Sequence, residues 1–91
     1  MELRRVHIRS GVEIDNLQLL ISDGVTEKYT QAVGGTGGGE YSWQVPESEH
    51  VTQVEFRTGD RVDSLTFITN KGTKSPKYGG DGGIYHLMNI P

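Results

Sequence analysis

The amino-acid sequence predicts an all-β fold on three observations. The stretch 6–19 recurs at 54–67 with the same layout: a run of alternating apolar and polar residues, a Gly-x-x-x-Asp loop and a second alternating run. The chain holds 13 glycines and 3 prolines, with β-branched and aromatic residues in short runs between them, which is typical of short strands joined by tight turns. No segment of useful length has the period of an amphipathic helix.

The recurring stretch reflects an internal repeat, because many identities fall at one offset. The identical pairs, 48 positions apart, are Val6 and Val54, Arg9 and Arg57, Gly11 and Gly59, Asp15 and Asp63, Leu17 and Leu65, and Gly24 and Gly72. A chain of 91 residues can bury one modest core but not two independent ones. We therefore expect a single domain over 1–91, with repeat one at about 4–46 and repeat two at about 51–91.

Alternation and turn residues predict four strands in the first repeat. Val6 and Ile8 alternate with polar residues in the first run, which indicates a half-buried strand, and Pro46 ends the last run. The expected strands are 4–9, 16–21, 27–33 and 41–45, separated by the loop 11–14, the turn 22–24 and the glycine cluster 34–39.

The second repeat follows the same order after a polar connector at 47–50. The expected strands are 51–57, 64–69, 74–78 and 84–90, separated by the loop 59–62, the turn 70–72 and the glycine cluster 79–83. The chain is thus expected to form about eight strands in two sets of four.

Composition argues against several classes of protein. Nine Lys and Arg residues stand against 12 Asp and Glu, a net charge of −3, and no basic run exceeds two residues, so nucleic acid is not an expected partner. With no cysteine, disulfides and thiolate zinc sites are excluded. His7, His50 and His86 lie in separate segments without ligand spacing, so we expect neither a metal nor another cofactor.

The sequence also predicts neither membrane insertion nor catalysis. No apolar run approaches the length that spans a membrane, so we expect a soluble chain, cytosolic or secreted without its leader. The cluster 34–39 lacks the Lys-Ser/Thr and the helix of a phosphate-binding loop. Asp15 and Asp63 are equivalent in the repeat, and equivalent surroundings would not divide an acid from a base.

Several motifs, taken in order, resemble the jacalin-related lectins. They are Gly11-x-x-x-Asp15, Gly59-x-x-x-Asp63, the glycine clusters 34–39 and 79–83, and the run 63–72 followed by Tyr78-Gly79-Gly80. The paired GG-x-GG and Gly-x-x-x-Asp elements most resemble the griffithsin-type mannose-binding lectins of that family. The resemblance covers nearly the whole chain.

The resemblance implies a β-prism I-like fold of three four-stranded Greek-key sheets around a pseudo-threefold axis. In that fold a glycine-cluster hairpin joins the Gly-x-x-x-Asp hairpin that follows it. This chain has two of each hairpin instead of three, so the third repeat is absent. By the resemblance, 27–45 and 51–69 form one full sheet, while the hairpins 4–21 and 74–90 are each left as half a sheet.

Half a sheet exposes unpaired backbone groups that favour association. The two halves either pair within one chain or pair with the halves of another chain. We prefer the second arrangement, which predicts a homo-oligomer formed by strand exchange. A further alternative is that the chain is a truncated or engineered piece of a longer lectin.

The residue types fit the chemistry of sugar recognition. A sugar offers adjacent hydroxyls, so a receptor needs a fixed carboxylate that accepts from two of them and backbone N–H groups that donate to sugar oxygens. In the second loop Asp63 supplies the carboxylate, and Gly59 lets the chain turn tightly enough to aim the N–H groups of Arg61 and Val62 inward.

The glycine clusters complete the predicted sites, because a backbone without side chains can approach a sugar closely. By the resemblance the cluster 34–39 serves Asp63 within one chain. Asp15 then needs the cluster 79–83, from the same chain or from a partner. The full set of expected carbohydrate-binding residues is Gly11, Glu13, Ile14, Asp15, Gly34, Gly35, Gly37, Gly38, Gly59, Asp60, Arg61, Val62, Asp63, Gly80 and Gly82.

The expected function is metal-independent binding of mannose- or glucose-type glycans or glycoproteins, but two features point to an alternative. Glu13 and Arg61 stand where sugar-binding members often carry an aromatic residue, so a charge replaces the stacking wall. Asp15 and Asp63 also fit as turn residues that bond their own loop backbone, and the glycine clusters fit as hairpin connectors. The alternative is a non-catalytic structural or self-assembly module that has lost sugar binding.

Overall fold

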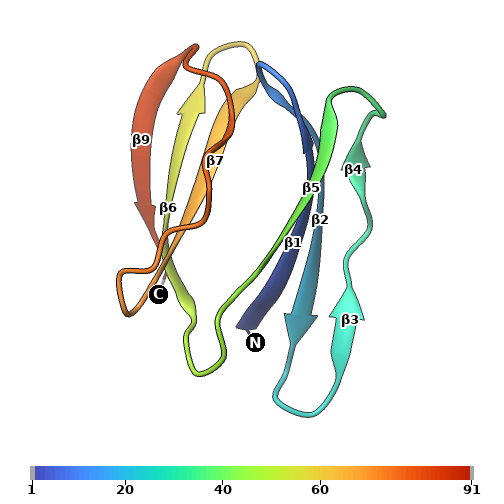
Figure 1. Cartoon of the computed structure of the whole chain (residues 1–91), viewed down its shortest axis with the longest axis vertical. Helices are drawn as coiled ribbons and strands as arrows, with labels where there is room; N and C mark the ends of the chain where they lie inside the picture. The colour runs from blue at the N-terminus through green and yellow to red at the C-terminus, as the bar shows by residue number, and fades with distance from the viewer. Residues whose placement is uncertain (1, 91) are drawn as a thin grey trace.

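The computed structural model describes residues 2–90, and β-strands are its regular secondary structure (Figure 1). The strands are β1 (Glu2–Ser10), β2 (Ile14–Ser22), β3 (Glu27–Tyr29), β4 (Val33–Gly34), β5 (Gly39–Gln44), β6 (Val51–Thr58), β7 (Val62–Thr69), β8 (Tyr78–Gly79) and β9 (Ile84–Asn89). Within residues 2–90 no helix is long and apolar enough to cross a membrane. The all-β prediction is confirmed.

The strands form two antiparallel sheets, one from each repeat. The first sheet has the order β3-β2-β1-β5, with β4 also paired to β2, and the second has the order β8-β7-β6-β9. In each sheet the last strand of the repeat returns to lie beside the first, which is a Greek key. Figure 1 shows the sheets as two walls, with β9 at one side of the molecule and β3 and β4 at the other.

This pairing corrects the expectation that 27–45 joins 51–69. β5 pairs with β1 in six residue pairs from Arg5–Gln44 to Ser10–Gly39, and β9 pairs with β6 from Gln53–Asn89 to Thr58–Ile84. Each glycine-cluster hairpin therefore folds back onto the hairpin that precedes it. No hairpin is left as half a sheet, so the reason for expecting strand exchange falls away.

The turn after β5 explains why the chain leaves the first sheet. The Glu49 N–H donates to the Pro46 carbonyl at 3.1 Å, and Ser48 has a φ of 70°. The chain thus makes a tight turn between the two sheets and begins β6 as a new strand. Hydrophobic alternation is the same on both sides of this turn, so it did not indicate which hairpins pair.

Two of the expected strands are interrupted by a side-chain hydroxyl, and the first interruption raises the strand number from eight to nine. The expected strand 27–33 is divided into β3 and β4, because Thr30 Oγ1 accepts the Leu19 N–H at 2.9 Å in place of a backbone carbonyl. In the second repeat Ser75 Oγ accepts the Phe67 N–H at 2.9 Å. There the strand expected at 74–78 is reduced to β8 and one bridge between Ile68 and Lys74.

The hydrophobic core lies between the two sheets. Val6 and Ile8 of β1 are buried almost completely, as their alternation predicted. Across the interface Trp43 stacks on Phe67 with ring centroids 6.1 Å apart. Tyr41 meets the buried Tyr78 with ring centroids 5.8 Å apart. The strands of both repeats therefore share one core.

Part of the apolar surface remains exposed. All six residues of β9, an edge strand, are exposed, among them Ile84, Leu87 and Met88. On the other sheet Val33 of β4 is also exposed.

Candidate functional site

The two Gly-x-x-x-Asp loops have the same conformation and lie at the same end of the molecule (Figure 1). In the first loop the Gly11 N–H donates to the Glu13 carbonyl at 3.0 Å, and in the second the Gly59 N–H donates to the Arg61 carbonyl at 3.0 Å. The internal repeat is therefore preserved in the hydrogen bonds of the loops.

Asp15 lies against the glycine cluster of its own repeat. A Cβ atom placed on Gly38 would lie 2.6 Å from Asp15 Oδ2, and one placed on Gly37 would lie 3.2 Å from Oδ1. Gly38 has a φ of +71°, in the left-handed region that favours glycine. The Asp15 carbonyl also accepts the Gly35 N–H at 2.7 Å. The carboxylate thus rests on backbone that carries no side chains.

Asp63 has the same surroundings in the second repeat. A Cβ atom on Gly83, whose φ is +72°, would lie 2.5 Å from Asp63 Oδ2, and one on Gly82 would lie 3.1 Å from Oδ1. The Gly80 N–H donates to the Asp63 carbonyl at 2.9 Å, and Gly59 stands next to the same carboxylate.

These contacts correct the expected combination of loops and clusters. The sequence predicted Asp63 beside 34–39 and Asp15 beside 79–83, but each aspartate lies beside the cluster of its own repeat. The cause is the pairing of β5 with β1 and of β9 with β6, which carries each cluster back to the preceding loop. Both arrangements are therefore formed within one chain.

Two arginines that were not among the expected site residues fix the clusters. Arg9 donates from Nε to the Gly37 carbonyl at 3.1 Å and from Nη2 to the Gly38 carbonyl at 2.9 Å. Arg57 makes the equivalent bonds to the carbonyls of Gly82 and Gly83, at 3.1 and 3.0 Å. Such two-armed bonds hold the glycine backbone in place. The identity of the two arginines across the repeat was the signal that pointed to them.

The two loops also touch each other. Arg61 Nη1 lies 3.7 Å from Glu13 Oε1. The second glycine cluster also approaches the first loop, since a Cβ on Gly80 would lie 2.5 Å from the Val12 carbonyl oxygen. Glu13 and Arg61, which stand where sugar-binding members of the family often carry an aromatic residue, thus form an ion pair between the loops. The Arg61 side chain is largely exposed, so the pair adds little stability.

Two pockets flank the loops, and the larger one contains six of the expected site residues. It has a volume of about 560 Å³ and is lined by Ile14, Asp15, Asn16, Leu17, Val33, Gly34, Gly35, Arg61, Val62 and Leu65. A smaller pocket of about 380 Å³ contains Gly11 beside Tyr41 and Tyr78.

The remaining acidic residues of these loops differ in their surroundings. The Asp60 side chain is exposed and makes no hydrogen bond or ion pair with the rest of residues 2–90. Asp81 of the second cluster is paired with Lys77, whose ammonium group lowers the pKa of that carboxyl below its ordinary value. Within the described residues, no group of three or more His, Asp or Glu side chains is placed to hold a metal ion.

The family model of the jacalin-like lectin domain matches residues 1–90. The chain belongs to the jacalin-like lectin family. The membership predicted from the loops and glycine clusters is thereby confirmed. A search of curated proteins gave no match.

Solved structures agree with the fold of this jacalin-like chain. It is similar to artocarpin complexed with Me-alpha-mannose, with a TM-score of 0.87 and 20% identity over 99% of this chain and 68% of that one. It is also similar to AcmJRL, a mannose-binding jacalin-related lectin from Ananas comosus, with a TM-score of 0.84 and 24% identity over 99% and 66%. For Malaysian banana lectin the TM-score is 0.82, with 21% identity over 98% and 66%. The chain thus spans about two thirds of the length of these lectins.

Proposed function

We propose that this jacalin-like chain binds carbohydrate at two equivalent sites, one at Asp15 and one at Asp63. The observation that supports this most is the repeated arrangement of a carboxylate against glycine backbone, fixed by an arginine. A carboxylate accepts hydrogen bonds from two adjacent hydroxyls, and exposed backbone N–H groups donate to other sugar oxygens. A turn residue alone would not need an arginine clamp on the neighbouring loop.

We infer that the ligand is a mannose- or glucose-type glycan. Two of the similar structures are described as a mannose-binding lectin and as a complex with Me-alpha-mannose. The Glu13–Arg61 ion pair in place of an aromatic wall favours weak single sites. Two weak sites at one end of the molecule would reinforce each other on a branched glycan.

Binding without catalysis is part of the proposal. Acid and base roles in glycoside hydrolysis need two carboxyl groups whose surroundings differ. Asp15 and Asp63 have matching surroundings, since each faces the same two glycines of its own repeat. Their equivalence therefore favours two binding sites over one divided catalytic pair.

Calorimetric titration with methyl α-mannoside tests this proposal. The wild-type chain is expected to bind two equivalents, and Asp15→Asn or Asp63→Asn to bind one. The amide keeps the shape but loses the charged acceptor, which weakens the affected site by about tenfold or more.

The double variant Asp15→Asn/Asp63→Asn is expected to lose binding at both sites. Glu47→Gln is the matched control, because it removes one charge at an exposed position away from the loops. Unchanged binding in the double variant would overturn the assignment of both sites. Thermal unfolding of each variant shows whether a loss of binding reflects a loss of fold.

A second candidate function, self-association, is supported by the exposed apolar side chains of β9. Burying such a surface against another copy is favourable, since apolar area is removed from water. A homo-oligomer formed by packing of β9 would also bring more sugar sites together.

A further inference from the structure

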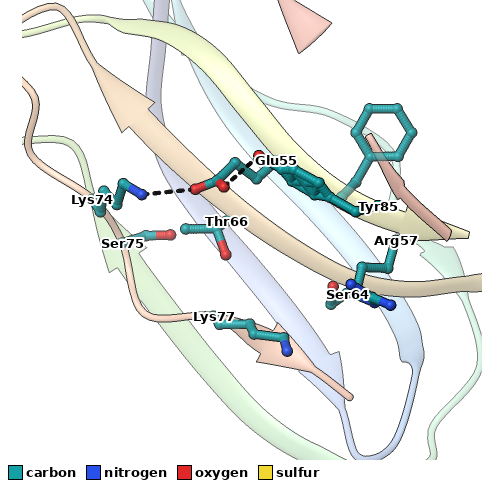
Figure 2. Close-up of a pocket in the computed structure, with 9 residues that line it drawn as sticks. Glu55, Arg57, Ser64, Thr66, Lys74, Ser75, Lys77 and Tyr85 are labelled. Atoms are coloured by element: carbon teal, nitrogen blue, oxygen red, sulfur yellow. Dashed lines mark hydrogen bonds and ion pairs between the residues drawn. The ribbon is translucent and has the colours of Figure 1, made fainter. Parts of the chain in front are cut away.

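We propose a third ligand site, on the outer face of the second sheet, that binds the acidic group of a saccharide such as a uronate or a sulfated sugar. The site is a pocket of about 390 Å³ that the loops do not form (Figure 2). It is lined by Glu55, Phe56, Arg57, Ser64, Thr66, Lys74, Ser75, Lys77 and Tyr85. The volume lies within the range of small-molecule sites.

The charge of this pocket is opposite to that of the whole chain. Three of the lining residues are basic, namely Arg57, Lys74 and Lys77, and only Glu55 is acidic. The chain as a whole carries a net charge of −3. A locally positive pocket on an acidic protein favours anionic ligands.

The single acidic group in the lining is already neutralised. Glu55 Oε2 accepts the Tyr85 hydroxyl at 2.6 Å, and Oε1 accepts the Lys74 ammonium at 3.0 Å. Both bonds lower the pKa of the Glu55 carboxyl, that of Tyr85 most. Figure 2 shows Glu55 between these two partners, while Arg57 and Lys77 lie farther along the pocket. An incoming anion would therefore meet the two cations that Glu55 does not engage.

Arg57 and Lys77 can each take an additional acceptor. Arg57 uses Nε and Nη2 for the cluster carbonyls, and within residues 2–90 its Nη1 makes no hydrogen bond. Lys77 is paired with Asp81, whose side chain is 91% exposed, so a ligand carboxylate or sulfate can share an ammonium that has three donors.

Tyr85 gives the pocket an aromatic wall suited to a sugar ring. The residue is 45% exposed, and its hydrogen bond to Glu55 fixes the ring. Aromatic faces pack against the apolar face of a ring while hydroxyls bond at the rim. Thr66 and Ser64 also line the pocket, and Ser64 lies beside Arg57 (Figure 2). The saccharide class rests on the proposed function, whereas the preference for an anion rests on the pocket alone.

Titration of the ¹⁵N-labelled full chain with sodium glucuronate tests the proposal. Glucose is the neutral match and sodium sulfate the anion without a ring, all at constant ionic strength. Glucuronate is expected to shift the amide signals of Lys74, Ser75 and Lys77 and to bind at least fivefold more tightly than glucose or sulfate. That factor corresponds to about one charge-assisted hydrogen bond at a half-exposed site.

Variants with opposite expected effects sharpen the test. Lys77→Gln should weaken glucuronate binding about fivefold, because it removes one cation, and Glu55→Gln should strengthen it by removing the only lining carboxylate. Lys28→Gln, an exposed lysine on the other sheet, is the matched control. Equal binding of glucose and glucuronate, or no effect of Lys77→Gln, would overturn the proposal. Sulfate that binds as tightly as glucuronate would overturn its saccharide part.

The Asp15→Asn/Asp63→Asn double variant separates this site from the loop sites. It is expected to lose methyl α-mannoside binding and keep glucuronate binding. If the double variant loses both ligands, glucuronate binds at the loops and the third site is refuted. If the wild-type chain binds glucuronate but no mannoside, the proposed loop function fails while the anion site stands.

Discussion

The absence of a side chain at single glycines sets the geometry of the proposed loop sites. Gly38 and Gly83 lie where a Cβ atom would meet the carboxylate of Asp15 or Asp63, and both have a positive φ. Arg9 supplies what the first cluster cannot, a side chain that bonds its carbonyls. The glycines allow the carboxylate to lie close to the backbone, and the arginine holds that backbone in place.

Gly83→Ala is expected to remove sugar binding at the proposed Asp63 site. The added Cβ atom would lie 2.5 Å from Asp63 Oδ2 and from the Thr58 carbonyl, so the carboxylate or the loop must move. The strain of a left-handed alanine adds about 1 to 2 kcal/mol of destabilisation. Calorimetry with methyl α-mannoside measures the loss of binding, and urea unfolding measures the loss of stability.

The matched control is Gly24→Ala. Gly24 has a φ of +97° but nothing lies within 4 Å of its added Cβ, so it carries a similar backbone strain without a clash at a site. It should lower stability and leave sugar binding unchanged. Equal binding by Gly83→Ala and Gly24→Ala would contradict the role given to the glycine cluster.

At this scale the sequence predicted the equivalence of the two aspartates. The repeat identified Asp15 and Asp63 as equivalent, and the structure gives both the same contacts. Arg9 and Arg57 were seen only as matching positions, because a bond from a side chain to a backbone carbonyl leaves no mark in the hydrophobic pattern. Their role appears only once β5 and β9 are paired.

At the scale of the elements, alternation predicted where strands lie but not how they pair. The alternating run around Val6 and Ile8 became β1 as expected. The chain leaves the first sheet at the turn 46–49, and this turn does not change the period of the strands. The interruptions at Thr30 and Ser75 were likewise hidden, since a hydroxyl that replaces a carbonyl looks like any polar residue.

Ser75→Ala is expected to destabilise the second sheet. Ser75 is buried, and its hydroxyl accepts the Phe67 N–H at 2.9 Å. Without it that buried donor loses a side-chain acceptor, which costs about 1 to 3 kcal/mol. Urea unfolding measures the change in midpoint.

Ser42→Ala is the control for this effect, because Ser42 is an exposed serine on β5. It is expected to change the stability by less than about 0.5 kcal/mol. An equal effect of the two variants would show that the hydroxyl at position 75 does not sustain the strand pairing.

At the scale of the whole molecule, two Greek-key sheets share one core and leave apolar side chains of β9 exposed. From the resemblance we predicted the family and the presence of two repeats. It also suggested half sheets, which the structure replaces by two complete sheets. The surface left exposed therefore consists of apolar side chains, and each hairpin has a partner within its sheet.

If β9 mediates self-association, Leu87→Glu is expected to lower the mass measured by light scattering to that of one chain. A buried, unpaired carboxylate opposes apolar contact between copies. Val25→Glu, at a turn residue that is 94% exposed, should leave the mass unchanged. A wild-type chain that is already monomeric across concentrations would contradict self-association through β9.

The central claim is that the two repeats form two equivalent sugar sites within one chain. Titration of the ¹⁵N-labelled chain with methyl α-mannoside tests it most directly, by following the backbone amides of Gly37, Gly38, Gly82 and Gly83. All four amide signals are expected to shift until saturation, together with those of their neighbours in the two Gly-x-x-x-Asp loops. Absence of shifts at both clusters, with the signals intact and the chain folded, would contradict it.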